Sequence, residues 1–396
     1  MPSQKYSNKK IKNNNLKLVL MEILQNGPIS RADISKRTHL TRSTVSQLVE
    51  KLIEEGLVKE MNKEEKKEGP GKKAILLSGE NEKFYVIGYD LTITNSKLIV
   101  MNLKGDIVKK SSFLPLKELI SIQNIELIVK SFYKSIESIK KELNISNDAI
   151  RGIGVALPGL VSHKNKSISF TPNLEQYFDF QSIEKFSEKL DIPIIIDNNA
   201  NMKALGELIY GIGKEFNNFL FVNVSYGIGA GLIINGQLFR GKYNLTGEIG
   251  HVKVVEDGDV CSCGMRGCLE TFSSVRSIVK KYYELSGKNL DKKFNIDTIV
   301  KKARKGDEIA IKIIRDSGFY LGKVIGNTLN IINLETVVFG GEIIEYWDIL
   351  ENDFYRGLNE TALDLVRKNI TIQLSKLGDE ITAIGAASIV LEDIFR

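Results

Sequence analysis

Residues 247–270 read GEIGHVKVVEDGDVCSCGMRGCLE, and this segment holds every cysteine of the 396-residue chain. An odd number of clustered cysteines, in a chain that opens without an apolar signal segment, argues against disulfides and for a metal site. The spacing His-x9-Cys-x-Cys-x4-Cys offers three thiolates and one imidazole, a complete tetrahedral set for zinc. The predicted ligands are His251, Cys261, Cys263 and Cys268. A full set leaves no position for a catalytic water, so the sequence predicts a structural zinc; three buried reduced thiols are the alternative.

Around this loop, short apolar strands alternate with helices from Lys83 onward. Such alternation predicts an α/β fold. A pair of strands opens near residue 84 and a similar pair opens near residue 219, which suggests two related α/β halves with a cleft between them. The expected strands are 84–90, 97–102, 150–156, 192–197, 219–224 and 336–339, and the expected helices are 122–144 and one that begins near Ala200.

The N-terminal piece has a different pattern. Apolar residues at helical spacing predict a helix over 15–25, which the Asn-Gly-Pro sequence at 26–28 ends. Ser30 and Asp33 form a variant capping box that opens a short helix. A tight turn that contains His39, interpreted as a surface or packing residue, leads to a longer helix that Thr41 caps and Gly56 ends. Helix, short helix, turn and helix is the helix-turn-helix pattern.

The third of these helices is predicted to read DNA, because the first turns of a recognition helix reach base edges in the major groove. Its exposed early residues are Arg42, Ser43, Thr44, Ser46 and Gln47. Two strands, 57–60 and 74–77, are expected to form a wing behind it. The basic wing tip, Lys72 and Lys73, fits a phosphate backbone or a minor groove. A plain three-helix packing unit is the alternative interpretation.

Charge and composition agree with this division. Residues 1–80 hold 16 Lys and Arg against 10 Asp and Glu, whereas residues 81–396 hold 39 of each. A basic N-terminal piece on a neutral body indicates a DNA-binding domain over 1–80 joined to a second domain over 81–396. Hydrophobic residues make up 42% and charged residues 26%, an ordinary globular composition. No apolar run approaches the roughly 20 residues of a membrane span, and we expect a cytoplasmic protein with no membrane partner.

Four sequence blocks together resemble the ROK family of repressors, open reading frames and sugar kinases. The resemblance covers about residues 80–396, and the zinc loop is its most specific part. The blocks are DNNAN with ALGE (197–201 and 204–207), SYGIGAG (225–231), GEIGH with CSCGMRGCLE (247–251 and 261–270), and VFGG (338–341). The segment FTPN (170–173) and the fused helix-turn-helix are most similar to the xylose-repressor branch.

The resemblance implies a winged helix-turn-helix fused to a two-lobed, actin-like body of the ribonuclease H-like, sugar-kinase type. It also implies a monosaccharide between the lobes. The implied sugar contacts are Gly159, Asn198, Asn199, Glu248, His251 and Glu270. The chemistry agrees, because each sugar hydroxyl donates and accepts and therefore suits carboxylates and amides. His251 has two ring nitrogens, so one can bind zinc while the other faces a sugar hydroxyl.

The chain departs from the family's kinases at two places. Asn199 occupies the position of their catalytic aspartate, and an amide cannot act as general base. The matching phosphate loop reads Asp-Leu-Thr-Ile-Thr (90–94), so Ile93 replaces a glycine that lets backbone amides approach phosphate. The sequence therefore predicts no ATP and no enzyme activity. The alternatives are an active ATP-dependent sugar kinase of the glucokinase type and a repressor that responds to a protein partner or to no effector.

The resulting hypothesis is a transcriptional repressor of carbohydrate genes that binds operator DNA as a homodimer or a higher oligomer. A monosaccharide releases it, with xylose favoured by the branch resemblance and glucose possible.

Overall fold

The structure is a computed structural model that describes residues 3–61, 74–80, 82–91, 96–113, 125–162, 167–170, 190–287 and 295–394. The chain forms two compact units. Unit 1 comprises Met1–Val155, Glu184–Ile195 and Ala386–Arg396, and unit 2 comprises Ala156–Ile183 and Ile196–Gly385. Within the described ranges, every helix is too short or too polar to cross a bilayer.

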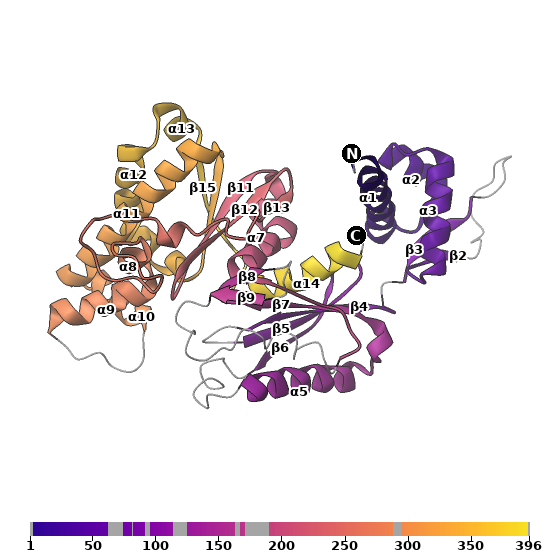
Figure 1. Cartoon of the computed structure of the whole chain (residues 1–396), viewed down its shortest axis with the longest axis horizontal. Coiled ribbons are helices and arrows are strands. Elements are labelled where there is room, and N and C mark those ends of the chain that lie inside the picture. Colours follow the sequence, from indigo (N-terminus) through magenta and orange to yellow (C-terminus); the bar gives the residue numbers. More distant parts are fainter. Residues whose placement is uncertain are drawn as a thin grey trace. The chain divides into compact units, whose positions relative to one another are not determined.

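The predicted helix-turn-helix is confirmed at the N-terminus of unit 1 (Figure 1). Its helices are α1 (Ser3–Asn26), α2 (Arg31–Thr38) and α3 (Arg42–Glu54). Ser30 caps α2 by accepting from the Asp33 amide at 3.1 Å and donates to the Asp33 carboxylate at 2.7 Å. Thr41 caps α3 by accepting from the Thr44 amide at 3.2 Å. Most of the apolar residues that the helical spacing placed inside are buried: Leu16, Val19, Leu20, Ile23, Leu24, Val45, Leu48, Val49 and Leu52. Ile53, which the same spacing also placed inside, is half-buried and packs against this cluster.

Two strands follow α3, as the wing pattern predicts, but the second lies further along the chain. They are β2 (Val58–Met61) and β3 (Leu76–Gly79), which pair antiparallel. A two-residue strand, β1 (Ile29–Ser30), which the sequence pattern did not indicate, pairs with the other edge of β3. The predicted wing tip at Lys72 and Lys73 lies outside the described residues.

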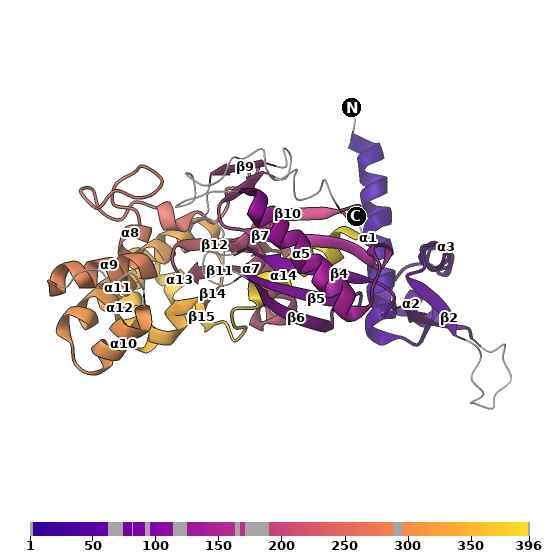
Figure 2. The ribbon, with the colours of Figure 1, turned by 90° about the horizontal axis from the view of Figure 1, so that it is seen from below.

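The rest of unit 1 is built on a five-stranded sheet with the order β6-β5-β4-β7-β10. The helix α5 (Ile125–Leu143) lies along one face of this sheet in both views (Figure 1 and Figure 2). Phe132 of α5 meets the Tyr89 ring of β4 edge-on at 5.2 Å. The strands are β4 (Tyr85–Asp90), β5 (Ser96–Asn102), β6 (Ile107–Phe113), β7 (Ile150–Leu157) and β10 (Ile194–Asn198), while β8 (Leu160–Ser162) and β9 (Ser167–Phe170) form a separate hairpin.

Unit 2 contains a second five-stranded sheet with the order β13-β12-β11-β14-β15. In both sheets the first strand is central, an antiparallel hairpin extends to one side, and two later strands extend to the other. This repetition agrees with the predicted pair of related halves. The strands are β11 (Phe219–Val224), β12 (Ile228–Ile234), β13 (Gln237–Phe239), β14 (Thr336–Gly340) and β15 (Thr371–Leu374).

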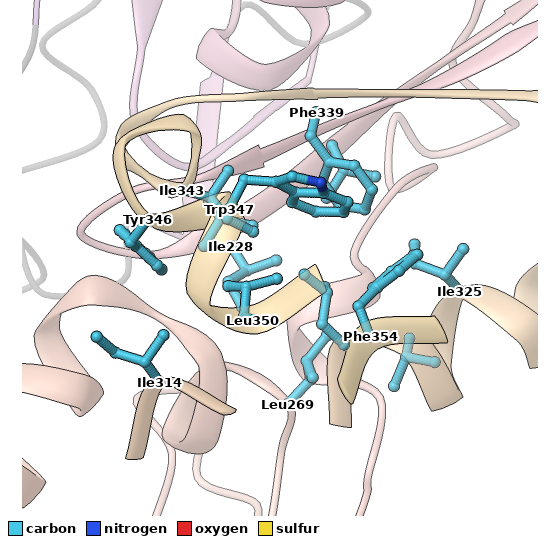
Figure 3. Packing of buried hydrophobic residues seen from close by; sticks show 14 of the residues in the cluster. Ile228, Leu269, Ile314, Ile325, Phe339, Ile343, Tyr346, Trp347, Leu350 and Phe354 are labelled. Carbon is cyan, nitrogen blue, oxygen red and sulfur yellow. The ribbon is translucent and has the colours of Figure 1, made fainter. Parts of the chain in front are cut away.

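Helices supply the larger part of the core of unit 2. They are α7 (Asn199–Tyr210), α8 (Glu270–Ser273), α9 (Val275–Ser286), α10 (Ile296–Arg304), α11 (Glu308–Ile332), α12 (Trp347–Thr361) and α13 (Asp364–Asn369), and α14 (Ile381–Ile394) passes from unit 2 into unit 1. Glycine lets α11 and α12 approach closely, because a Cβ on Gly322 would lie 2.0 Å from the Phe354 carbonyl oxygen. Figure 3 shows Phe339, Trp347 and Phe354 gathered in this core, with ring centroids 5.0 to 5.4 Å apart.

Candidate functional site

Backbone contacts and hydrogen bonds shape the cysteine loop, residues 247–268. Gly247 starts it at φ +93°, where a Cβ would lie 1.9 Å from the Ala230 carbonyl oxygen, so only glycine fits. A short 3-10 turn, Ile249–His251, then places the histidine ring. The Cys261 amide donates to the Met265 carbonyl at 2.7 Å and closes a tight turn around Cys263. Cys268 pairs with Lys253 in an isolated bridge, which returns the loop to its starting point.

The four predicted metal ligands converge. One ligand atom from each of His251, Cys261, Cys263 and Cys268 lies within 4.8 Å of the others. The His251 Nδ1 atom lies 3.4 Å from the Cys261 sulfur, and the Cys263 and Cys268 sulfurs are 3.7 Å apart. A tetrahedral zinc site with Zn–S near 2.3 Å and Zn–N near 2.0–2.1 Å has edges of about 3.8 Å between sulfurs and about 3.6 Å between sulfur and nitrogen. The cluster therefore fits a metal ion of zinc's size and preference.

The protonation of this cluster is set by burial and by the ligands' own hydrogen bonds. Burial raises the pKa of Cys268 to about 12, and a hydrogen bond with Cys263 adds to the effect. Burial also acts upward on Cys261, but hydrogen bonds with His251 and with the Cys263 backbone outweigh it and lower the pKa of Cys261 to about 7. The same contact with Cys261 raises the pKa of His251, against the effect of its burial. Metal binding requires all three thiols to release their protons.

Two carboxylates lie beside the histidine of this cluster. The second ring nitrogen of His251, Nε2, lies 3.8 Å from a Glu248 carboxylate oxygen. Burial raises the pKa of Glu248, and the charge of Glu270 raises it further against the opposing effect of His251. Glu270 accepts from the Ile228 amide at 3.1 Å, and its other oxygen accepts from the Ser262 hydroxyl at 3.4 Å. The structure thus brings Glu248, His251 and Glu270 together beside the glycine-rich segment 225–231, with the histidine shared between metal ligands and carboxylates.

The asparagines of the predicted sugar segment have different roles. Asn198 caps α7 by accepting from the Ala200 amide at 2.7 Å, and its Nδ2 donates to the Gly159 carbonyl at 2.6 Å. Both ends of this amide are therefore engaged, and Asn198 fixes Gly159, which has φ +117°. Asn199 is half-buried at the start of α7, and its side chain makes no hydrogen bond with any residue in the part of the chain that the structure describes.

The sequence patterns did not reveal the role of Arg240, which directly follows β13 and binds Asp197. Asp197 is fully buried, and the Arg240 Nε donates to one of its oxygens at 2.8 Å. The other oxygen accepts from the Asn201 side chain at 3.0 Å, the Asn244 side chain at 3.4 Å and the Asn198 amide at 2.7 Å. The Asp197 carboxylate therefore ties the segment that precedes Glu248 to the start of α7. Only the folded chain reveals this role, because 43 residues separate Arg240 from Asp197.

A cavity of about 220 Å³ opens beside the cysteine loop and α9. Of the predicted sugar residues, only Glu270 lines it. Hydroxyls from Ser262, Thr271, Ser274 and Ser277 also line it, as do three basic residues (Arg276, Lys280 and Lys281) and two further acidic ones (Asp259 and Glu284). Its charges are therefore balanced, and it differs from the carboxylate and amide set of the predicted sugar site.

The candidate DNA-reading residues lie at the N-terminal end of α3. Arg42, Ser43 and Gln47 are exposed, whereas Thr44 and Ser46 are half-buried. The Ser43 and Thr44 hydroxyls lie 3.0 and 2.8 Å from the Thr41 hydroxyl, so part of their hydrogen-bonding capacity serves the helix cap. His39 is exposed in the turn at φ 57°. The predicted departure of the phosphate loop at Ile93 lies outside the described residues.

Comparison with known proteins agrees with both parts of the chain. The model of the ROK family matches residues 86–393, and that of the MarR family matches residues 17–67. The xylose repressor of Bacillus subtilis (strain 168) is 32% identical over 382 residues, which cover 96% of each chain. The DNA-binding transcriptional dual regulator NagC of Escherichia coli (strain K12) is 30% identical over 385 residues, which cover 96% of this chain and 93% of NagC.

Solved structures share the fold. A ROK family transcriptional regulator described as a homolog of the E. coli MLC protein superimposes with a TM-score of 0.81, at 22% identity, over 97% of both chains. A ROK hexokinase from Thermus thermophilus superimposes with a TM-score of 0.63, at 23% identity, over 78% of this chain and all of the hexokinase. The hexokinase thus leaves about a fifth of this chain unmatched, whereas the regulator matches almost its full length. The two family-model matches and the regulators that match over almost the full length show that the chain belongs to the ROK family, as one of its transcriptional regulators with an N-terminal helix-turn-helix.

Proposed function

We propose that this protein is a sugar-responsive repressor that binds operator DNA as a homodimer in the cytoplasm and leaves it when a monosaccharide binds. One observation carries the proposal: the chain combines two parts. The first is a helix-turn-helix whose α3 exposes its early polar residues, and the second is a body in which Glu248, His251 and Glu270 lie close together. A xylose repressor and a DNA-binding transcriptional dual regulator that match along almost the full length of the chain support it. Xylose is the favoured effector, and glucose is the second candidate.

The sugar would lie against Glu248, Glu270, Asn199 and the His251 Nε2 atom. Convergent carboxylates and an amide suit the paired donors and acceptors of a polyol. The sugar must bind the DNA-incompetent state more tightly than the DNA-competent one, since equal affinity would shift neither population. Asn198 contributes indirectly, because its amide is engaged in holding Gly159 and capping α7.

Zinc would be held by His251, Cys261, Cys263 and Cys268 as a structural ion. When bound, it supplies a fixed tetrahedral centre and no open position for water. Nδ1 lies on the cysteine side of the His251 ring and Nε2 on the Glu248 side. Ligation through Nδ1 would fix the tautomer and orientation that the ring has here. In this proposal the loop joins metal binding to the shape of the sugar site.

The absence of enzyme activity is part of the proposal. Asn199 stands where the family's kinases hold their general base, and its amide cannot accept a proton from a sugar hydroxyl. The nearby Asp197 is no substitute, because its carboxylate is buried and hydrogen-bonded to Arg240, Asn201 and Asn244. We therefore expect no ATP turnover with xylose or glucose.

The test is fluorescence anisotropy of labelled DNA from upstream of the gene, titrated with protein at fixed salt, with and without xylose or glucose. Salt is fixed because phosphate contacts make DNA affinity steeply salt-dependent. Tight binding that one sugar releases is the expected result. Binding no tighter than to a random duplex would contradict the regulator, and sugar-dependent ATP hydrolysis in the same preparation would favour the kinase.

Replacing Arg42 by alanine is expected to weaken operator binding by about 1–3 kcal/mol and to leave sugar affinity unchanged. The exposed guanidinium sits in the first turn of α3, where a recognition helix meets bases or phosphates. The control is Lys51→Ala, which removes a cation from the last turn of the same helix, where Lys51 pairs with Glu55 at 3.4 Å. An equal effect of both substitutions would mean that charge, and not position on α3, governs binding.

Replacing Glu248 by glutamine is expected to lower sugar affinity by about tenfold, the cost of one charge-assisted hydrogen bond, while operator affinity is retained. The variant would then stay on DNA at sugar concentrations that release the native protein. Titration calorimetry with xylose and glucose measures the first effect, and anisotropy measures the second. Glu256→Gln is the control, since this exposed carboxylate pairs with Lys253 in the same segment. Unchanged sugar affinity in Glu248→Gln would remove this residue from the site.

A further inference from the structure

One arginine links the last turn of α3 to the sheet of unit 1. Arg151, the second residue of β7, donates from Nη2 to the carbonyl of Glu55 at 3.2 Å. Glu55 is the C-terminal cap of α3. The guanidinium also lies over the Phe84 ring, 3.7 Å from its centroid. An arginine that stacks and donates at the same time fixes the end of a helix in direction as well as position.

The apolar core of the helix-turn-helix is continuous with the body of unit 1. Phe84 and Leu103 belong to the same buried cluster as Leu52 and Leu57, and Leu391 of α14 packs against that cluster. Phe84 is 7% exposed and Leu103 is 2% exposed. The three helices are therefore docked on the sheet by buried apolar surface, and a tilt of α3 must move against Phe84 and Arg151.

The other end of the same strand leads to the candidate sugar site. From Arg151 to Leu157 at the end of β7 is six residues, about 20 Å of extended chain. Two residues further on, Gly159 accepts the hydrogen bond from Asn198, which ends the neighbouring strand β10. A second hydrogen bond joins β7 to the start of β10, where the Ile153 amide donates to the carbonyl of Pro193, the residue before β10, at 2.9 Å.

We propose that Arg151 is the positioning residue through which β7 passes the state of the sugar site to α3. The inference rests on the proposed function and names the regulation of its site. Sugar bound at Asn199 and Glu248 changes the Gly159–Asn198 contact, β7 shifts as a rigid element, and the Arg151–Phe84 stack turns the end of α3. Rigid secondary elements with two arrangements carry coupling in this way. The Arg151 Nε atom is buried without a partner in the described part of the chain. Among the described residues, the Phe84 ring and the Glu55 carbonyl orient the guanidinium.

The test compares Arg151→Ala with the native protein in two titrations, operator DNA with and without saturating xylose, and xylose with and without operator DNA. Coupling is reciprocal, so sugar and DNA must weaken each other by the same factor, on the order of 5–150-fold for typical allosteric proteins. In Arg151→Ala we expect both factors to fall toward 1, while the affinity of the DNA-free protein for xylose is unchanged. Arg151→Lys keeps the charge but loses the planar stack, and we expect an intermediate factor.

The control is Arg304→Ala, because Arg304 likewise donates to a backbone carbonyl, that of Glu345 at 2.9 Å, but lies in unit 2. Undiminished coupling in Arg151→Ala, or an equal loss in Arg304→Ala, would overturn the inference. So would weaker operator binding with the coupling factor intact, which is the mark of a merely structural contact. A native protein that binds operator but ignores xylose and glucose would instead contradict the proposed function.

Hydrogen exchange tests the docking itself without any effector. We expect the amides of Gly56 and Leu57, which donate to the carbonyls of Ile53 and Leu52, to exchange at least about tenfold faster in Arg151→Ala, equivalent to about 1.4 kcal/mol of lost local stability. Equal exchange rates in the variant and the native protein would overturn the role of Arg151, whichever sugar is the effector.

Discussion

Cys263→Ser is expected to lose its zinc and its sugar response together. The variant keeps three of the four ligands, but a serine hydroxyl is not ionised at neutral pH and binds zinc poorly compared with a thiolate. Loss of an outer-shell hydrogen bond alone costs about 10–100-fold in metal affinity, and loss of a ligand costs more. After dialysis against a chelator we expect about one zinc per chain in the native protein and little in the variant, measured by atomic emission.

The sugar response is expected to be lost with the zinc because His251 is both a metal ligand of the cluster and a proposed sugar contact. Without a metal on Nδ1, the ring is held mainly by its contact with Cys261, and Nε2 no longer faces Glu248 in a fixed direction. Met265→Ser is the matched control, since it introduces serine into the same loop at an exposed side chain. Normal sugar binding by a zinc-free Cys263→Ser protein would break the proposed link between the two sites.

Arg240→Met is expected to lower the free energy of unfolding by about 3–5 kcal/mol, the range for removing one partner of a buried ion pair. Methionine preserves most of the side-chain volume but removes the guanidinium that pairs with the Asp197 carboxylate, which is 0% exposed. Denaturant unfolding followed by the fluorescence of Trp347, the single tryptophan of the chain, reports on unit 2 directly.

A second substitution distinguishes the contribution of the ion pair to stability from that of the packing of the Arg240 side chain. In Arg240→Met with Asp197→Asn, the buried group is neutral and its oxygen can still accept from Asn201 and the Asn198 amide, so we expect most of the stability to return. Arg304→Met is the control, because its pair with Asp348 is exposed on both sides and is worth about 0–1 kcal/mol. No recovery in the double variant would show that packing of Arg240, and not its charge, stabilises the region.

Local sequence patterns predicted the features that depend on residues close together in the chain. Helix caps at Ser30 and Thr41 depend on residues three positions apart, and the helix-turn-helix followed from them. The metal ligands lie within one loop of 18 residues, 251–268, so their spacing was enough to predict the cluster that the structure assembles. The apolar runs 219–224 and 150–156 predicted strands, and the structure has them at Phe219–Val224 and Ile150–Leu157, where both are largely buried.

Contacts between distant segments could be found only in the folded chain. Short-range patterns were enough to predict the fold class, the helix-turn-helix and the metal ligands, because each depends on neighbours along the chain or on motifs of fixed spacing. Three contacts became visible only in the folded chain: Arg240 pairs with Asp197, Asn198 donates to Gly159, and Arg151 joins the Phe84 ring to the end of α3. A buried charge or amide must find its partner wherever the fold brings one within reach, and sequence separation places no limit on that choice.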